Sequence, residues 1–211
     1  MPSLTVEVGR FREWAEGYPA ERRSGEWECD YAAWPALYDA VLGFVASRPF
    51  DAWSDADVRD VLYAIARDNE AQHLAQEIRR RHSELLPPLA RAAMERGERD
   101  DRWQLAEELG HAGLADAEPL LLELAADPHE YVRRRALQSL TRLRSPAAER
   151  LALEAWHRPD PDQEWARMMA LWSLNELGSP QLLSLFDDAE RDERPYLRGY
   201  AERIRRGEAA G

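Results

Sequence analysis

The feature that constrains this chain most is a pattern that recurs about every 31 residues. Four similar segments lie at 74–78, 105–109, 136–140 and 170–174, and a partial copy follows at 200–204. Their last residues are 31, 31, 34 and 30 positions apart. A period of this length is typical of stacked repeats, in which each unit buries its apolar face against the next.

The repeating unit is predicted to be a pair of α-helices. Ala, Leu, Glu and Arg dominate, apolar residues recur at steps of three and four, and Pro or Gly interrupts the chain at short intervals. Strand signals are poor, because apolar and polar residues alternate convincingly only over 4–8. The segment 9–26 reads as a surface loop, and Ser54 and Asp57 have the spacing of a capping box. Helices are expected at 27–47 (starting near Ala33 or kinked by Pro35), 55–67, 70–82, 84–96, 102–112, 117–126, 130–143, 146–157, 163–177, 180–189 and 195–206.

The loops between helix pairs repeat as well. Asp127-Pro128, Asp160-Pro161 and Arg194-Pro195 are each followed by an aromatic residue and, two positions later, by Arg. The stretch 127–143 closely resembles the first helix of a HEAT repeat, and 161–180 resembles the next one. The resemblance implies an all-α superhelical solenoid of about four helix pairs. We place the pairs at 68–98, 99–127, 128–160 and 161–191, and a half-repeat at 192–206.

The rest of the chain divides around these repeats. Residues 1–67 are expected to form an N-terminal cap that includes a degenerate half-repeat at 51–67, and 207–211 a disordered tail. The first quarter of the sequence holds 10 of the 19 aromatic residues. They are interpreted either as the cover of the open end of the solenoid or as an anchor surface for a partner.

Acidic and basic residues recur in register near the start of each first helix. Asp127 with Arg133, and Asp160 or Asp162 with Arg167, are expected to pair and to hold neighbouring repeats together. The other interpretation of the repeated arginines is a phosphate-binding ladder.

The resemblance implies that the second helix of each pair lines the concave face. In the repeat register Leu89, Leu120, Leu151 and Leu185 point to the core, while Ala92, Glu123, Glu154 and Asp188 form an outward row. The expected surface is acidic with two leucines at its centre, and it is interpreted either as a groove for a basic protein or peptide or as a solvated face. Its predicted partner-binding residues are Glu118, Leu122, Glu123, Glu149, Leu153, Glu154, Asp187 and Asp188.

Charge argues against nucleic-acid binding. The chain has 40 acidic residues against 28 cationic ones, all Arg, and a net charge of −12. Nonspecific binding to phosphates needs the opposite balance. The alternative is a HEAT-like DNA-binding protein of the alkylpurine DNA glycosylase type, which the basic runs 79–81 and 133–135 and several Trp residues would serve.

No motif indicates a metal, a cofactor or catalysis. The five His residues are scattered, with one His-Glu dipeptide at His129, and Cys29 between two acidic residues reads as an inert thiol. No segment has the length and apolarity of a membrane span, and no secretory signal is visible. The sequence therefore predicts a cytoplasmic, non-catalytic scaffold or adaptor, and leaves its oligomeric state open.

Overall fold

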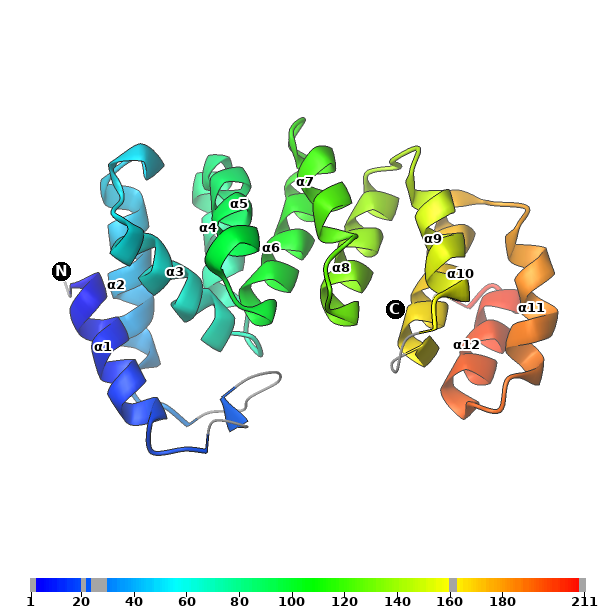
Figure 1. Ribbon diagram of the computed structural model, residues 1–211, viewed down its shortest axis with the longest axis horizontal. Coiled ribbons are helices and arrows are strands. Elements are labelled where there is room, and N and C mark those ends of the chain that lie inside the picture. The colour runs from blue at the N-terminus through cyan, green and yellow to red at the C-terminus, as the bar shows by residue number, and fades with distance from the viewer. Residues whose placement is uncertain (1–2, 20–21, 24–29, 160–162, 209–211) are drawn as a thin grey trace. The chain divides into compact units, whose positions relative to one another are not determined.

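The computed structural model describes residues 3–19, 22–23, 30–159 and 163–208, and all regular structure in these ranges is helical. It divides into two compact units, Met1–Leu120 and Leu121–Gly211. The helices, labelled in Figure 1, are α1 (Leu4–Ala15), α2 (Trp34–Ser47), α3 (Asp55–Arg67), α4 (His73–His82), α5 (Leu86–Arg96), α6 (Arg99–Ala112), α7 (Ala117–Leu124), α8 (Glu130–Arg142), α9 (Ala148–His157), α10 (Gln163–Leu177), α11 (Leu182–Arg191) and α12 (Pro195–Arg205), with short 3₁₀ turns η2 (Phe50–Ala52) and η3 (Ser83–Leu85).

Helix α1 is the main difference from the predicted arrangement. The sequence predicts no helix at 4–15 and assigns 9–26 to a loop, but residues Leu4–Ala15 are helical. Leu4, Val8 and Phe11 step by four and three along one face and are buried where α1 packs against α2 and α3. Packing of this stripe outweighs the modest strand preference of Thr and Val.

The breaks between the other helices lie close to the positions that the spacing of Pro and Gly predicts. Helix α2 starts at Trp34 with Pro35 in its first turn, where a missing backbone N–H costs no hydrogen bond. Trp27, the first residue of the helix predicted at 27–47, lies outside the described residues. At α3 the predicted capping box is present: Ser54 Oγ accepts from the Asp57 N–H at 3.2 Å, and Asp57 Oδ2 accepts from the Ser54 N–H at 2.9 Å.

The first unit places α3 against α5 and α6, and α4 against α2 and α6. Ile65, Leu74, Ile78 and Leu105 form part of its closed core. The units divide the chain at a different place from the predicted boundary at residue 67, because α3 packs on the helices that follow it.

Aromatic side chains of the N-terminal segment pack on one another within the first unit. Phe11 is fully buried, and its ring centroid lies 4.8 Å from that of Tyr31 and 5.0 Å from that of Trp34. Tyr38 donates to Asp68 Oδ1 at 2.7 Å. These rings come from α1, α2 and the segment between them, and their role as the cover of the open end of the solenoid stays a prediction.

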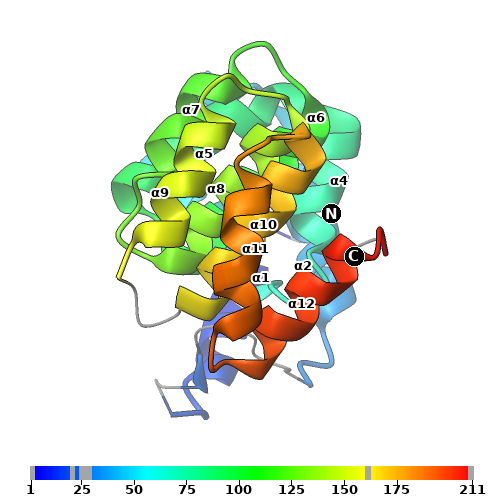
Figure 2. The same cartoon turned by 90° about the vertical axis from the view of Figure 1, so that its right-hand side faces the viewer.

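The second unit is built around α10, which contacts α8, α9, α11 and α12. Figure 2 shows α10, α11 and α12 next to one another. Leu171, Leu174, Phe186 and Leu197 belong to its core. Leu151, expected in the core, is half-buried and packs against the edge of this cluster.

The turns inside the two helix pairs of this unit have the same backbone conformation. Arg144 has φ of 55° and Gly178 has φ of 67°, both in the left-handed region. The next residue donates its N–H back across the turn in each case, from Ser145 to the Leu140 carbonyl and from Ser179 to the Leu174 carbonyl, both at 2.9 Å. This is the pattern of a Schellman helix end. The repeat equivalence seen in the sequence therefore extends to single backbone bonds.

The end of α12 is more ordered than expected. Gly207, at φ of 69°, donates to the Ile204 carbonyl, and Glu208 donates to the Arg203 carbonyl. These two residues close the helix instead of starting a disordered tail, and 209–211 lie outside the described residues.

Candidate interaction surface

The repeated arginines fasten the loops between helix pairs. Arg133 Nη1 donates to the carbonyls of Asp127 and Pro128 at 2.7 and 2.8 Å, and Arg198 Nη1 donates to the Asp192 carbonyl at 2.6 Å. Asp127, the predicted partner of Arg133, thus accepts this hydrogen bond through its backbone carbonyl oxygen. Asp160 and Asp162, the partners predicted for Arg167, lie outside the described residues.

Asp192 is the acceptor on which two guanidinium groups converge. Arg167 Nη1 lies 2.9 Å from its Oδ2, and Arg194 binds both carboxylate oxygens. The hydrogen bond from Arg194 is the first cause that lowers the pKa of Asp192 to about 2. These arginines hold repeats together, which is the structural interpretation of the ladder.

The two runs of three arginines are engaged in the same way. In the first run Arg79 pairs with Glu108, while Arg80 and Arg81 share Glu77 at 2.8 and 2.7 Å. In the second, Arg134 Nε lies 2.9 Å from Glu130 Oε1 and Arg135 donates to the Tyr131 hydroxyl at 2.8 Å. A phosphate would have to displace these partners, which weakens the DNA-binding alternative.

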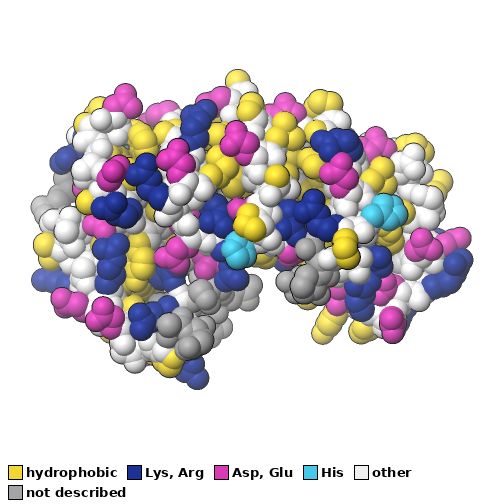
Figure 3. Space-filling view, in the orientation of Figure 1, with side chains coloured by type: hydrophobic (Ala, Val, Ile, Leu, Met, Phe, Trp, Pro, Cys, Tyr) yellow, Lys and Arg dark blue, Asp and Glu magenta, His cyan; other side chains and the backbone are white. Residues whose placement is uncertain are grey.

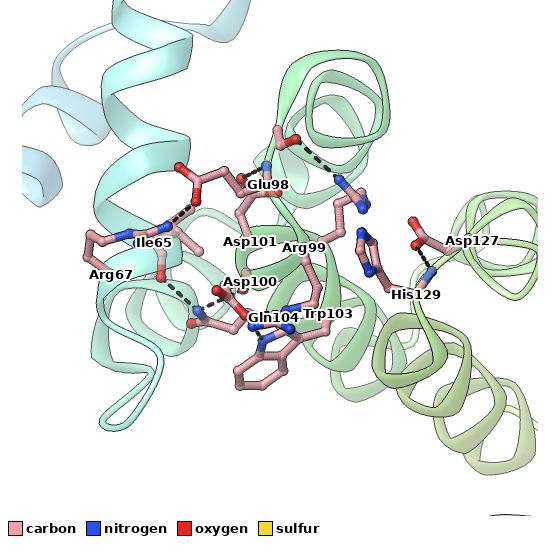
Figure 4. A network of polar contacts seen from close by, with 12 residues as sticks. Ile65, Arg67, Glu98, Arg99, Asp100, Asp101, Trp103, Gln104, Asp127 and His129 are labelled. Carbon is pink, nitrogen blue, oxygen red and sulfur yellow. Dashed lines mark hydrogen bonds and ion pairs between the residues drawn. The ribbon is translucent and has the colours of Figure 1, made fainter. Parts of the chain in front are cut away.

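A buried polar network joins α3 to the start of α6, and sequence reasoning did not identify it (Figure 4). Gln104 is fully buried and donates to the carbonyls of Ile65 at 2.7 Å and of Asp100 at 3.0 Å. Arg67, which is 4% exposed, pairs with Glu98. Asp101 accepts from the Glu98 N–H at 2.7 Å, and burial is the main cause that raises its pKa to about 8. The network fixes α3 against α6 within the first unit.

Of the predicted partner-binding residues, Glu118 belongs to the first unit and the other seven to the second. Leu122, Glu123, Glu149, Glu154, Asp187 and Asp188 are exposed, and Leu153 is half-buried against the core. Ala92, expected in the same outward row, is buried at 7% exposure. The row therefore does not continue as an exposed line into α5.

An open hollow of about 770 Å³ lies along α9. The predicted Glu149, Leu153 and Glu154 line it together with Pro146, Arg150, His157 and Arg158. Arg150 binds Glu154 at 2.5 Å, whereas Glu149 accepts from the neutral Ser179 hydroxyl at 2.5 Å and forms no ion pair with a described residue. The hollow is therefore amphipathic and of mixed charge.

Helix α11 adds an exposed apolar side chain that sequence reasoning missed. Leu183 is 73% exposed, and Asp187 lies one helical turn further along the same face. Asp187 is 3.7 Å from Arg191 and from Arg205, whereas Asp188 forms no ion pair with any described residue. The double leucine at 182–183 was the available signal, because only one of two adjacent residues on a helix can face the core.

The surplus of acidic residues is not where the predicted surface lies. The sequence of the first unit has 24 acidic residues against 14 arginines, and that of the second unit has 16 against 14. On the face shown in Figure 3, acidic and basic side chains are interspersed over α8 and α9. Any preference for a basic partner thus depends on a few unpaired carboxylates.

In the described part of the chain, none of the helices is long and apolar enough to cross a membrane. None of the clusters among the same described residues brings together three or more His, Cys, Asp or Glu side chains that could hold a metal ion. Cys29 lies outside these residues.

Comparison with known proteins agrees with the helix pairs. A family model described as HEAT repeats matches residues 86–166 and 118–203, which together cover more than half of the chain. No curated protein and no solved structure shows significant similarity. The repeated loops, the matched turns and the family model lead to one conclusion: the chain belongs to the HEAT-repeat family.

Proposed function

We propose that the chain is a non-catalytic scaffold that binds a basic segment of a partner protein on the exposed face of α9 and α11. HEAT repeats commonly serve as protein-interaction scaffolds. The observation that supports this face is the hollow along α9, where three of the predicted residues occur together. We call Glu149, Leu153, Glu154, Leu183, Asp187 and Asp188 the α9–α11 face.

Two chemical features of this face suit a basic peptide. Leu153 and Leu183 offer apolar surface to a partner, and the Leu183 side chain is 73% exposed. Burying such a leucine in an interface is favourable by about 1.5–3 kcal/mol. Glu149 and Asp188 bind no cation among the described residues and are available to a partner. Leu122 and Glu123 of the same unit, and Glu118 of the first unit, stay predicted partner-binding residues.

The test is site-specific photocrosslinking in the native host. We would replace Leu153 by p-benzoylphenylalanine, with Val6 on α1, 49% exposed, as the matched control position. The proposal expects a protein adduct from position 153 that position 6 does not give, with the crosslink in a basic segment. Adding Glu149→Arg and Asp188→Arg should remove the adduct.

These two reversals are cleaner than Glu154→Arg, because Glu154 already holds Arg150 one turn away and its reversal would create a like-charge pair. An adduct that persists after both reversals would contradict a charge-selective face. Crosslinks to an acidic segment, or to DNA, would replace the proposed partner by another class.

A further inference from the structure

A ladder of three rings runs along the starts of α8, α10 and α12, and the guanidinium groups of Arg134 and Arg135 both lie over its first ring, Tyr131. The guanidinium carbon of Arg134 lies 4.6 Å from the ring centroid of Tyr131 and 5.9 Å from that of Trp165. Trp165 in turn stacks on Tyr196, with centroids 5.9 Å apart and planes at 25°. The three rings occupy the equivalent positions that follow the repeated proline loops.

The far end of this ladder is open to solvent. Trp165 is 42% exposed and Tyr196 is 65% exposed, and both belong to the small set of large apolar side chains that are exposed among the described residues. Their stack therefore adds little to the core of the unit. Exposed Trp and Tyr side chains are the types enriched where partner proteins bind most strongly.

The charges around the two rings favour a cation as the missing neighbour. Arg194 and Arg167 are already held by Asp192. Glu164, adjacent to Trp165, accepts only a backbone N–H, from Leu197 at 3.2 Å, and Glu193, three residues before Tyr196, is exposed. Neither carboxylate forms an ion pair with a described residue.

We propose that the Trp165–Tyr196 pair is a docking site for an arginine side chain of a partner protein. The incoming guanidinium stacks on the exposed face of Tyr196, as Arg134 stacks on Tyr131, and its N–H groups reach Glu164 or Glu193. The site lies at the starts of α10 and α12 and is separate from the α9–α11 face, so it goes beyond the function proposed above.

The chemistry selects arginine over two other occupants. A guanidinium group is planar, weakly hydrated and able to stack and donate in its plane at the same time, whereas an ammonium group is a strongly hydrated point charge. A single-stranded nucleic acid could also stack on these rings, but its phosphates would meet the two unpaired carboxylates.

The experiment is a titration of the full chain followed by the indole N–H resonance of Trp165 in ¹H–¹⁵N spectra, assigned through Trp165→Phe. The probes are three peptides, acetyl-Gly-Xaa-Gly-Xaa-Gly-amide with Xaa as Arg, Lys or citrulline, and an octathymidylate. The arginine peptide should shift the resonance saturably, and the lysine peptide should bind about threefold more weakly. Citrulline, which keeps the plane but loses the charge, should bind more weakly still.

Tyr196→Ala should lower the affinity for the arginine peptide about fivefold. This position is exposed, so the variant keeps the test valid even where a change at Trp165 disturbs the fold. Val6→Ala, at an exposed apolar position of α1 outside both proposed sites, is the control and should change nothing. Glu149→Arg should also leave this titration unaltered, which separates a failure here from a failure of the α9–α11 face.

Four outcomes would overturn the assignment. They are an indole resonance that no peptide moves, equal affinities for the arginine and lysine peptides, full binding by Tyr196→Ala, and a tighter response to the octathymidylate. The last result would make the ladder a stacking platform for bases instead.

Discussion

Replacing Asp101 by Asn should remove a large part of the pH dependence of stability above neutrality. Burial is the main cause that raises the pKa of this carboxyl from 3.8 to about 8 in the folded chain, and the nearby Glu98 adds to it. The native state therefore holds a proton that the unfolded chain has already released. A group of this kind stabilises the fold most below pH ~4, and its contribution is lost as the pH rises through about 8.

The size of the effect follows from the two pKa values. Between pH 7 and pH 9 the native carboxyl changes from ~10% to ~90% ionised, whereas the unfolded one is ionised throughout. The free energy of unfolding should therefore fall by roughly 1–2 kcal/mol over this interval through Asp101 alone. In a chain of this size the loss corresponds to about 3–6 °C in the melting temperature.

The assay is urea unfolding followed by far-UV circular dichroism at pH 6, 7, 8 and 9. Asn keeps a carbonyl oxygen to accept the Glu98 N–H, which Asp101 Oδ2 accepts at 2.7 Å, and cannot ionise. The difference between the wild type and Asp101→Asn should grow by roughly 1–2 kcal/mol from pH 7 to pH 9 in favour of the variant. Asp188→Asn, at an exposed carboxylate, is the control and should show no such trend. Parallel curves for the wild type and Asp101→Asn would refute the reasoning.

Three further predictions concern stability and are checked by the same unfolding assay. Leu185→Ala, at a 6% exposed position, should cost about 2–5 kcal/mol, whereas Leu183→Ala on the same helix should stay within about 0.5 kcal/mol, and equal losses would contradict the assigned burial. Gly97→Ala should destabilise by about 1–3 kcal/mol because its Cβ would lie 2.5 Å from Asp101 Oδ1 and 2.7 Å from the Ala93 carbonyl, while Gly9→Ala, with nothing within 4 Å, should be neutral or stabilising. Arg167→Ala should cost about 1–3 kcal/mol at pH 7 and less at pH 2, where its partner Asp192, with a pKa of about 2, is half protonated; a loss that does not change with pH would argue against this ion pair.

The fold could be predicted from the sequence wherever a local signal and the repeat agreed. Ser54 and Asp57 marked the start of α3, and the turns after Leu143 and Leu177 matched because both helices end in the same backbone conformation. Helix α1 could not be predicted in this way. Its residues 4–8 fit two periods, and contacts with α2 and α3, distant in sequence, decide between them.

The candidate surface was predictable in position more than in charge. Exposure of Glu149, Glu154 and Asp188 follows from helical register, which the repeats set. Which carboxylates stay free of an ion pair depends on neighbouring side chains, such as Arg150 beside Glu154, and the helical register does not fix those contacts. The buried position of Gln104 was harder still to predict. Its acceptor, the Ile65 carbonyl, lies 39 residues away, and a single Gln in a sequence is usually assigned to the surface.

The convergence on Asp192 has a consequence for the order in which the second unit opens. Helix α12 is the last described helix, and a helix in that place would ordinarily fray, with its amide protons exchanging almost as fast as those of a loop. The loop before α12, however, binds Arg167 of α10 through the Asp192 carboxylate and Arg198 of α12 through the Asp192 carbonyl. Opening α12 therefore breaks contacts to α10, so its amides should exchange at the rate set by that helix, and α10, α11 and α12 should open as a single cooperative unit.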